Sequence, residues 1–261
     1  MTETPEPTPA DTGVSRVFSG QRAGVAALAI SLIALVAAVA PYLNGGSFDG
    51  RVRGYLLKHP EVLQEVSAAL QDKEDQQRVS AVQQRADANP ALLRADPRDP
   101  AFGPADAKVT VVEFFDFRCP GCKATAPEVL RLMQAHPDVR FVFKDWPILD
   151  RGSDGVSHHA ARAALAAHRQ GKYLPVFRDL MAQPSLDQAA IDGILAANGV
   201  SMAQAQAEIS SPDIARHLAD IDTAGQALQL VGTPTFFVAG KAQASIQPAE
   251  LDRAIREAKA G

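Results

Sequence analysis

The chain has 261 residues, of which 46% are hydrophobic and 21% are charged, a composition typical of a globular protein with an ordinary core. Its net charge of −4 and its pI near 5.9 argue against a nucleic-acid-binding role. Two cysteines are too few for a disulfide-stapled scaffold or a four-cysteine zinc site, and no Cys/His spacing supplies a second pair of metal ligands.

The N-terminal region combines a polar tail with a long apolar segment. The first 20 residues are rich in proline, threonine and acidic residues, so we expect a disordered tail over 1–22. Residues 23–48 carry no charge, and the segment 23–43 is long enough to cross a bilayer as a helix, which needs about 20 apolar residues. We therefore expect a single transmembrane helix over 23–43.

Two alternatives to this helix exist. One is a buried core helix, although the position behind a polar tail argues against it. The other is a cleaved signal peptide, because Ala38-Val39-Ala40 resembles the small-residue pattern at a cleavage site. The long, partly acidic leading segment and Pro41 just after the cut favour an uncleaved anchor. Basic residues lie on both sides of the segment, so their count does not decide its orientation.

Residues 44–94 predict a helical stalk, in which Pro60 suits the first turn of a new helix. Beyond Leu70 the apolar stripe of this helix thins, so the helix buries little surface alone. It then packs either on the main domain or on copies of itself, and we favour self-association over a solvated spacer. The apolar residues at helical spacing are Val62, Leu63, Val66, Ala69 and Leu70.

The rest of the chain predicts one α/β domain. Three prolines in 95–107 indicate a stiff linker, and the domain follows over 108–261. Its order is β-α-β, then several helices, then β-β-α. The expected segments are a buried strand over 108–117, a helix from the cysteines onward, a strand over 139–148, helices to about 229, strands over 233–240 and within 241–246, and a helix over 248–260.

Both cysteines lie in Cys119-Pro120-Gly121-Cys122, between a predicted strand and a predicted helix. A structural disulfide usually closes a longer loop, because the entropic gain grows with loop length. At a helix start, free N–H groups and the helix dipole stabilise a thiolate, so we expect a lowered pKa at Cys119. This context favours a redox motif over half of a metal site.

The neighbouring residues fit this interpretation. Pro120 suits the first helical position, and Gly121 is expected to leave space for a partner chain. Cys122 lies one turn inward, where it can close the ring or resolve a mixed disulfide. Lys123 adds positive charge nearby, and we expect it to point to solvent.

Thr233-Pro234 precedes the strand expected over 233–240. Bonds before proline are the main place where a cis peptide occurs, and a proline that cannot donate to the ladder belongs at the first residue of a strand. An ordinary turn before a strand is the alternative.

Together, the strand, the Cys-Pro-Gly-Cys motif, the helix and Gly232-Thr233-Pro234 resemble the DsbA-type thiol–disulfide oxidoreductases of the thioredoxin superfamily over residues 100–260. The resemblance implies an α/β thioredoxin fold with an inserted helical subdomain over about 150–229. It also implies thiol–disulfide exchange that needs neither a cofactor nor a metal.

The resemblance assigns roles to five residues. Cys119 matches the exposed attacking cysteine and Cys122 the buried resolving one. Pro234 matches the cis-proline that faces the disulfide, and the backbone of Thr233 matches the position that pairs with a bound peptide. Glu113 matches an acid under the active site that assists proton transfer, and burial would raise its pKa. An acid turned outward at a strand end is the alternative for Glu113.

The dipeptide Pro120-Gly121 tunes the redox pair in this family. Strongly oxidising members have a histidine beside the second cysteine, and its absence here removes one source of thiolate stabilisation.

The stalk is similar to the N-terminal segment of suppressor-of-copper-sensitivity C proteins. In parts of that group, the segment oligomerises the chain and supports disulfide isomerase activity.

These observations predict a membrane-anchored thiol–disulfide oxidoreductase, acting as an oxidase or isomerase on extracytoplasmic proteins. The expected location is a bacterial inner membrane, crossed once, with a cytoplasmic tail. Expected partners are client proteins with cysteines, a membrane redox partner and copies of the chain through the stalk, but no nucleic acid. A reductase kept reduced by a membrane partner and a copper-binding membrane protein are the alternatives.

Overall fold

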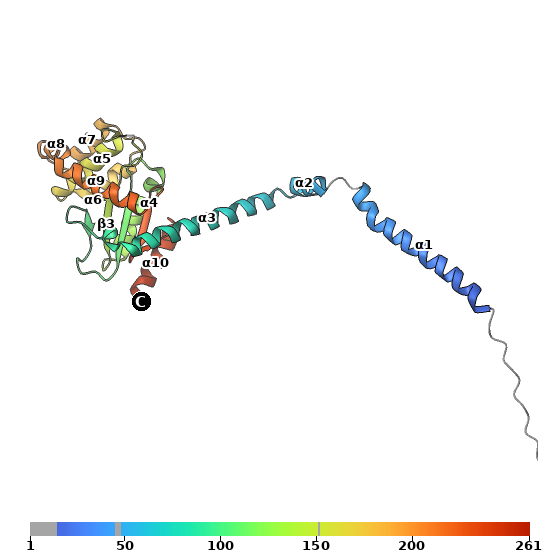
Figure 1. Ribbon diagram of the computed structural model, residues 1–261. Coiled ribbons are helices and arrows are strands. Elements are labelled where there is room, and N and C mark those ends of the chain that lie inside the picture. The colour runs from blue at the N-terminus through green and yellow to red at the C-terminus, as the bar shows by residue number, and fades with distance from the viewer. Residues whose placement is uncertain (1–14, 45–47, 151) are drawn as a thin grey trace, which may run out of the picture. The chain divides into compact units, whose positions relative to one another are not determined.

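The computed structural model of the chain describes the backbone of residues 15–44, 48–150 and 152–261, with side chains from residue 24 to 40 and from 48 onward except residue 151. The described residues fall into two compact units that divide between Leu70 and Gln71 (Figure 1). Each unit is considered by itself below.

The first unit is helical. It contains α1 (Ser15–Asn44), α2 (Phe48–Lys58) and the beginning of α3 (Glu61–Ala88), which starts directly after Pro60. Because α1 begins at Ser15, the expected tail is helical over 15–22, while 1–14 lie outside the described residues. Within the apolar stripe of the stalk, Leu63, Val66 and Leu70 are exposed and Val62 is half-buried.

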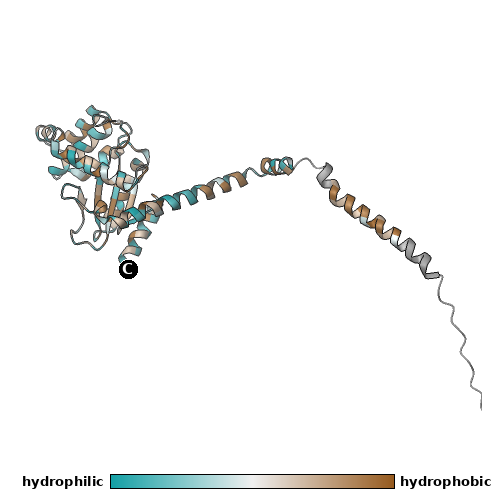
Figure 2. Cartoon of the chain, in the orientation of Figure 1, coloured by the Kyte–Doolittle hydropathy of each residue, from teal (hydrophilic) through white to brown (hydrophobic). Residues whose placement is uncertain are grey.

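The described side chains of α1 are almost uniformly apolar (Figure 2). Even so, none of the helices, as far as the structure describes them, is both long and apolar enough to cross a membrane. The span expected over 23–43 extends at both ends beyond the residues whose side chains the structure describes.

The second unit is built on one five-stranded sheet with the order β1-β3-β2-β4-β5. Strands β2 and β3 are parallel, as the helix between them requires, and the other pairs are antiparallel. The expected order of β-α-β, helices and β-β-α is confirmed. The elements are η1 (Pro90–Leu93), β1 (Ala101–Phe102), β2 (Thr110–Phe115), α4 (Pro120–Ala135), β3 (Arg140–Asp145), α5 (Val156–Arg169), α6 (Tyr173–Ala182), α7 (Gln188–Ala197), α8 (Met202–Ile209), α9 (Pro212–Ala227), β4 (Thr235–Val238), β5 (Lys241–Ala242) and α10 (Pro248–Ala260).

Strand β1 was not expected, since it lies inside the segment predicted as a linker over 95–107. It pairs with β3 through Ala101 and Phe102 only. The three residues between Pro100 and Pro104 are too few to show an alternation of apolar and polar side chains, so nothing in the local pattern indicates a strand there.

Successive residues of the central strands point to opposite faces of the sheet. On one face, Phe115 and Phe143 lie 5.4 and 5.0 Å from the ring of Phe177 in α6. On the other face, the ring of Phe114 lies 6.1 Å from that of Trp146, whose indole N–H donates to Asp222 of α9. Both faces are therefore covered, which explains the nearly continuous apolar run of β2 and the three apolar residues at the centre of β3.

Helices α5 to α9 form the inserted subdomain expected over about 150–229, and they gather on one side of the second unit, away from α10 (Figure 1). Helix α5 contacts α6, α7, α8 and α9, and its alanines, among them Ala160 and Ala164, are fully buried. Small side chains let four helices approach α5 closely, which agrees with a packing role for this alanine-rich segment.

The last turns of α3 belong to the second unit and pack on its sheet. Val82 and Ala86 are buried in the core. The side-chain amide of Gln83 donates to the carbonyl of Gly240 at 3.2 Å and accepts from the backbone N–H of Ala242 at 2.7 Å. These bonds cover the free edge of β5, where an open strand would expose unpaired backbone groups.

Candidate active site

Cys119 and Cys122 lie where the central strand β2 gives way to α4. Cys119 is the N-cap residue of α4, and Pro120 occupies its first position, as the sequence predicts. The backbone N–H of Cys119 donates to the carbonyl of Asp116 at 3.1 Å, which holds the turn between strand and helix. Both cysteines are free; Cys119 is 9% exposed and Cys122 is fully buried.

The two thiols differ sharply in acidity. The pKa of Cys119 is lowered to about 5, first by a hydrogen bond from Cys122 and also by the backbone N–H groups of Cys122 and Gly121 at the helix start. Burial raises the pKa of Cys122, and its contacts with Cys119 and Glu113 raise it further. Near neutral pH, Cys119 is therefore the thiolate and Cys122 the thiol.

The loop before β4 faces Cys119. The peptide bond between Thr233 and Pro234 is cis, and the sulfur of Cys119 lies 3.1 Å from the carbonyl oxygen of Thr233. The hydroxyl of Thr235 donates to the carbonyl of Gly232 at 2.8 Å, which holds the loop in shape. The structure thus brings together the two motifs that lie over a hundred residues apart in the sequence.

Gly121 differs from expectation. A Cβ placed there would lie 3.2 Å from Cδ of Pro234 and 3.7 Å from the sulfur of Cys119. The space beside Gly121 is therefore taken up mainly by the proline ring and is not open to a partner chain.

Glu113 is buried beneath the cysteines, at 2% exposure, and not turned outward at a strand end. It pairs with Phe143 of β3 and Phe236 of β4 in the sheet. Neither carboxyl oxygen has a hydrogen-bond partner among the described residues. Burial, followed by the charge of Asp145, raises the pKa of Glu113 to about 8. The site therefore contains a carboxyl group that holds its proton at neutral pH.

Asp145 at the end of β3 belongs to the same buried face, and the sequence argument missed it. Its carboxylate accepts a hydrogen bond from the hydroxyl of Tyr173 in α6 at 3.0 Å. Burial raises the pKa of Asp145 well above its usual range. The sequence did contain a signal for Asp145, because this acidic residue lies at the end of an apolar strand. Glu113 is comparable, since it interrupts the apolar run of the neighbouring strand.

Asp116 was also missed, although it organises the loops around the motif. Its carboxylate accepts from the backbone N–H of Arg118 at 2.7 Å, the backbone N–H of Leu149 at 3.0 Å and the hydroxyl of Ser157 at 2.9 Å. These bonds join the end of β2, the loop after β3 and the start of α5. Asp116 thereby fixes the position from which Cys119 is presented.

Lys123 does not point to solvent, contrary to expectation. Its ammonium group donates to the carbonyls of Leu180 at 3.1 Å and Gln183 at 2.7 Å, at the C-terminal end of α6. Free carbonyls at a helix end attract a cation, which explains why the side chain turns inward. Burial lowers the pKa of Lys123.

A second buried polar cluster lies on β3 and α9. The ammonium of Lys144 lies 2.5 Å from one carboxylate oxygen of Asp99, and Nε2 of His217 lies 3.1 Å from the other. The carboxylate of Asp99 thus neutralises the charge of the buried Lys144. Within the described part of the chain, no group of three or more His, Cys, Asp or Glu side chains is arranged to hold a metal ion.

A low-pKa cysteine at a helix start, a buried second cysteine and a cis-proline loop opposite them define the thiol–disulfide oxidoreductases with a thioredoxin fold. The family described as "Thioredoxin" matches residues 95–257, and the chain belongs to this family. Residues 47–77 match the "Copper resistance protein ScsC N-terminal domain". The chain is thus of the DsbA/ScsC type, which confirms both resemblances inferred from the sequence.

Solved structures support this assignment. A thioredoxin-like oxidoreductase from Silicibacter pomeroyi DSS-3 is 36% identical, and the match covers 66% of this chain and 99% of that chain with a TM-score of 0.60. BcfH of Salmonella enterica Typhimurium is 28% identical over 88% of this chain and 99% of its own, with a TM-score of 0.62. Proteus mirabilis ScsC in a transitional conformation, at 24% identity, shares the fold over 80% of this chain and 94% of its own, with a TM-score of 0.61.

Curated relatives are similar over part of their length only. The Na(+)/H(+) antiporter NhaA 3 of Salinispora tropica is 34% identical over 160 residues, which is 58% of this chain and 23% of the relative. NhaA 1 of Salinispora arenicola is 34% identical over 153 residues, again 23% of its length. The chain thus spans about a quarter of the length of the curated relatives that it matches.

Proposed function

We propose that the chain exchanges disulfides with extracytoplasmic client proteins, as an oxidase or an isomerase. The observation that carries this proposal is the contrast between the two cysteines. Cys119, with a pKa of about 5, lies beside the Thr233 carbonyl and retains 9% exposure, whereas Cys122 is fully buried with a raised pKa. One cysteine is suited to bond with a client, and the other to resolve that bond.

In the oxidising direction, a client thiolate attacks the sulfur of Cys119 in the Cys119–Cys122 disulfide. The bond between the two cysteines breaks, and Cys122 leaves as a thiolate. A second client thiolate then attacks the client sulfur of the mixed disulfide, and Cys119 leaves as a thiolate. The client gains one disulfide and loses two electrons and two protons. The cysteine pair gains the two electrons, Cys122 takes up one proton, and the other proton goes to solvent because Cys119 stays a thiolate.

Glu113 is suited to the proton transfer in this sequence. Cys122 leaves into a buried site where its thiolate is unfavourable, and a carboxyl group with a pKa of about 8 holds a proton nearby at neutral pH. In the reverse direction, the Cys119 thiolate attacks a client disulfide, and Cys122 attacks Cys119 after its proton passes to Glu113. Isomerisation uses the first half of this reverse sequence, followed by attack of another client thiolate.

The acidity of Cys119 favours oxidase or isomerase activity over reductase activity. Its pKa of about 5 lies between the values of about 7 in thioredoxin and about 3.5 in DsbA. A stabilised thiolate stabilises the reduced form, so the disulfide is more readily given to a client than that of thioredoxin. For a reductase the same stabilisation acts in the opposite direction, because it makes the transfer of electrons from the cysteine pair to a client disulfide less favourable.

Copper binding by the cysteine pair is a second candidate, and the description of the family that matches residues 47–77 favours it. Thiolates are suitable ligands for Cu(I). The metal content of the purified, reduced chain separates the two candidates, because exchange requires no bound metal.

We also propose that residues 23–43 anchor the chain in a bacterial inner membrane, with the domain on the extracytoplasmic side. The charge-free sequence of this segment supports the anchor. Disulfide clients occur in oxidising compartments, which supports the orientation, and a fold relative from Salmonella enterica serovar Typhimurium is described as periplasmic. A membrane redox partner would then recycle the pair, and the exposed apolar stripe of the stalk would join copies of the chain.

The decisive experiment is to equilibrate the Cys119–Cys122 pair of the full chain against glutathione buffers. We expect a reduction potential between about −270 mV, as in thioredoxin, and about −120 mV, as in DsbA. Cys119→Ser should abolish exchange, and Cys122→Ser should accumulate mixed disulfides with clients in cells. Exchange that persists in Cys119→Ser would overturn the assignment.

A further inference from the structure

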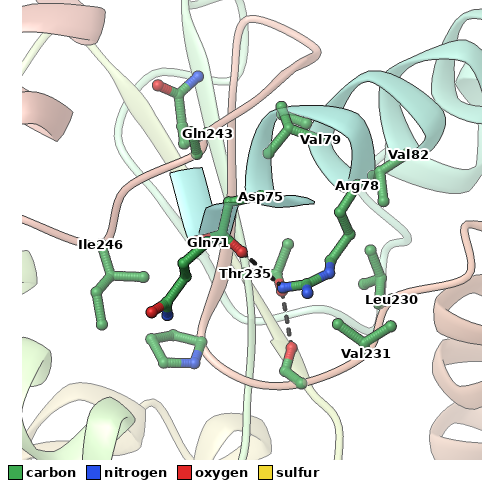
Figure 3. A pocket seen from close by; sticks show the side chains of 14 residues that line it. Gln71, Asp75, Arg78, Val79, Val82, Leu230, Val231, Thr235, Gln243 and Ile246 are labelled. Carbon is green, nitrogen blue, oxygen red and sulfur yellow. Dashed lines mark hydrogen bonds and ion pairs between the residues drawn. The ribbon is translucent and has the colours of Figure 1, made fainter. Parts of the chain in front are cut away.

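Two acidic side chains buried beneath the cysteines lack the partners that charged residues at the surface have. Arg78 and Asp75, which line a cleft between α3 and the loop of Pro234, pair with each other at 3.0 Å (Figure 3). Glu113 and Asp145, by contrast, are only 2% and 1% exposed. Both carboxyl oxygens of Glu113 and one of Asp145 have no hydrogen-bond partner among the described residues.

The two carboxyl groups lie on the same face of the sheet. In the parallel pair of β2 and β3, Glu113 lies opposite Phe143, and Phe115 lies opposite Asp145. Residues two apart on a strand share a face, so Glu113 and Asp145 are diagonal neighbours on adjacent strands. Helix α6 covers this face, where the ring of Tyr173 lies 5.6 Å from that of Phe143. The surroundings of both carboxyl groups are therefore largely aromatic.

Two charges side by side in such surroundings are strongly disfavoured. Burial penalises each carboxylate, and the charge of one raises the pKa of the other. The pKa of Glu113 is accordingly raised to about 8, first by burial and then by the charge of Asp145. Asp99 nearby adds a further negative charge that raises the pKa of Asp145, and its own oxygens are held by Lys144 at 2.5 Å and His217 at 3.1 Å. Near neutral pH the two carboxyl groups therefore hold one proton between them.

One hydrogen bond determines which carboxyl group holds this proton. The hydroxyl of Tyr173 donates to Asp145 at 3.0 Å, and no described residue donates to Glu113. Burial raises the pKa of Tyr173 well above its usual range, so its hydroxyl remains a donor. The ring of His168 in α5 packs 5.8 Å from that of Tyr173, and burial lowers the pKa of His168, which keeps it uncharged. A hydrogen bond to a carboxylate favours its charged form, so the charge lies on Asp145 and the proton on Glu113.

We propose that Tyr173 is a positioning residue for proton transfer, which keeps the charge of the carboxyl pair on Asp145 and the proton on Glu113, beneath Cys122. When Cys122 leaves as a thiolate, its sulfur takes this proton and Glu113 becomes a carboxylate. Because Asp145 is already charged, Glu113 then recovers a proton from solvent. The inserted subdomain thus takes part in the exchange through α6. The inference rests on the proposed exchange function and deepens it.

The test is to titrate Glu113 directly in the reduced full chain. NMR of labelled glutamate carboxyl carbons follows the ionisation, and Glu113→Gln identifies the signal of Glu113. The wild-type midpoint should lie near pH 8. Tyr173→Phe removes only the hydroxyl and should lower this midpoint by about one pH unit, because Asp145 then keeps its proton and no longer repels a charge on Glu113. Tyr55→Phe is the matched control, because Tyr55 is exposed on α2, and it should leave the midpoint unchanged.

A second variant removes the charge itself. Asp145→Asn should also lower the midpoint of Glu113, and it covers the case in which Tyr173→Phe fails to fold. The pH profile of kcat/KM for exchange should move in the same direction in both variants, a shift that a loss of packing alone would not produce. A midpoint that stays near pH 8 or rises in the folded variants overturns the inference. A wild-type chain that exchanges no disulfide at any pH would instead refute the proposed function.

Discussion

The ammonium nitrogen of Lys123 lies 2.7 Å from the carbonyl oxygen of Gln183, just beyond the last turn of α6. Lys123 directly follows Cys122 in α4. The active-site helix and the inserted subdomain are thus joined by a charged contact beside the cysteines. This contact makes the insert part of the framework that holds the motif.

Lys123→Met should destabilise the domain without changing the acidity of Cys119. The methionine keeps most of the apolar stem but leaves the carbonyls of Leu180 and Gln183 without their donor, at a cost of about 1–3 kcal/mol. Lys123 is not among the groups that lower the pKa of Cys119. Thermal unfolding and thiol alkylation measure the two effects. An unchanged Tm with a raised Cys119 pKa would show that the charge acts on the thiolate instead.

The alkylation rate of Cys119 in the reduced chain should titrate with a midpoint near pH 5. Cys122→Ala should move the midpoint upward, because the hydrogen bond from Cys122 is the largest cause of the lowered pKa. Iodoacetamide alkylation followed over about pH 3 to 9 measures both midpoints, since the ordinary pKa of a cysteine thiol is about 8.5. A midpoint above about 8 in the wild type would contradict the assigned thiolate.

The same shift predicts a pH dependence of the redox equilibrium. A thiol whose pKa is depressed on folding stabilises the reduced form fully above its unfolded value near 9, and this stabilisation is lost as the pH falls towards 5. Relative to an unperturbed dithiol, the pair should therefore become less oxidising from pH 9 to pH 5. Titration against glutathione at several pH values checks this sign.

Glu113→Gln should stabilise the domain near neutral pH while slowing exchange. The unfolded carboxyl releases its proton near pH 4.5 and the folded one near pH 8, so stability is fully present below 4.5 and falls as the pH rises to 8. The variant removes this loss, a gain on the order of 3 kcal/mol at pH 7. Denaturant unfolding at pH 4 and pH 7 should show the gain only at pH 7. An equal gain at both values would place its origin outside the ionisation of Glu113.

The stalk prediction concerns assembly. Leu63 and Val66 are 52% and 60% exposed and share one helix face, so the double variant Leu63→Asp, Val66→Asp should reduce the oligomeric state of the full chain. Gln64→Asp, an exposed neighbour, is the control and should leave it unchanged. Sedimentation in a detergent or buffer that keeps the chain dispersed measures this. A wild type that sediments as a monomer would contradict self-association.

The fold and the cysteine pair could be predicted because their signals are local. A few residues are enough to predict the local structure at three places: the apolar run of β2, the motif Cys119–Cys122 and Thr233-Pro234. Family resemblance then joined the two motifs and located Glu113. The burial of Glu113 followed from the apolar residues on either side of it.

The features that could not be predicted depend on long-range contacts. Gln83 is polar in a polar helix, and only the fold places the edge of β5 against it. In the sequence Lys123 looks like a surface lysine, and only the fold places the carbonyl of Gln183, after α6, within hydrogen-bond distance of it. The bond between Asp145 and Tyr173 joins a strand to a helix of the insert, and periodicity carries no information about such a pair.

The approach of Pro234 to Gly121 has a consequence for how this chain can be altered. Any side chain at position 121 would press on the proline ring, since even a Cβ would lie 3.2 Å from Cδ of Pro234. The residue whose backbone N–H helps to lower the pKa of Cys119 is therefore also the one against which the cis-proline ring packs. We expect substitutions in the dipeptide Pro120-Gly121 to shift the loop before β4 together with the acidity of the thiol, so the two properties would change together under directed evolution.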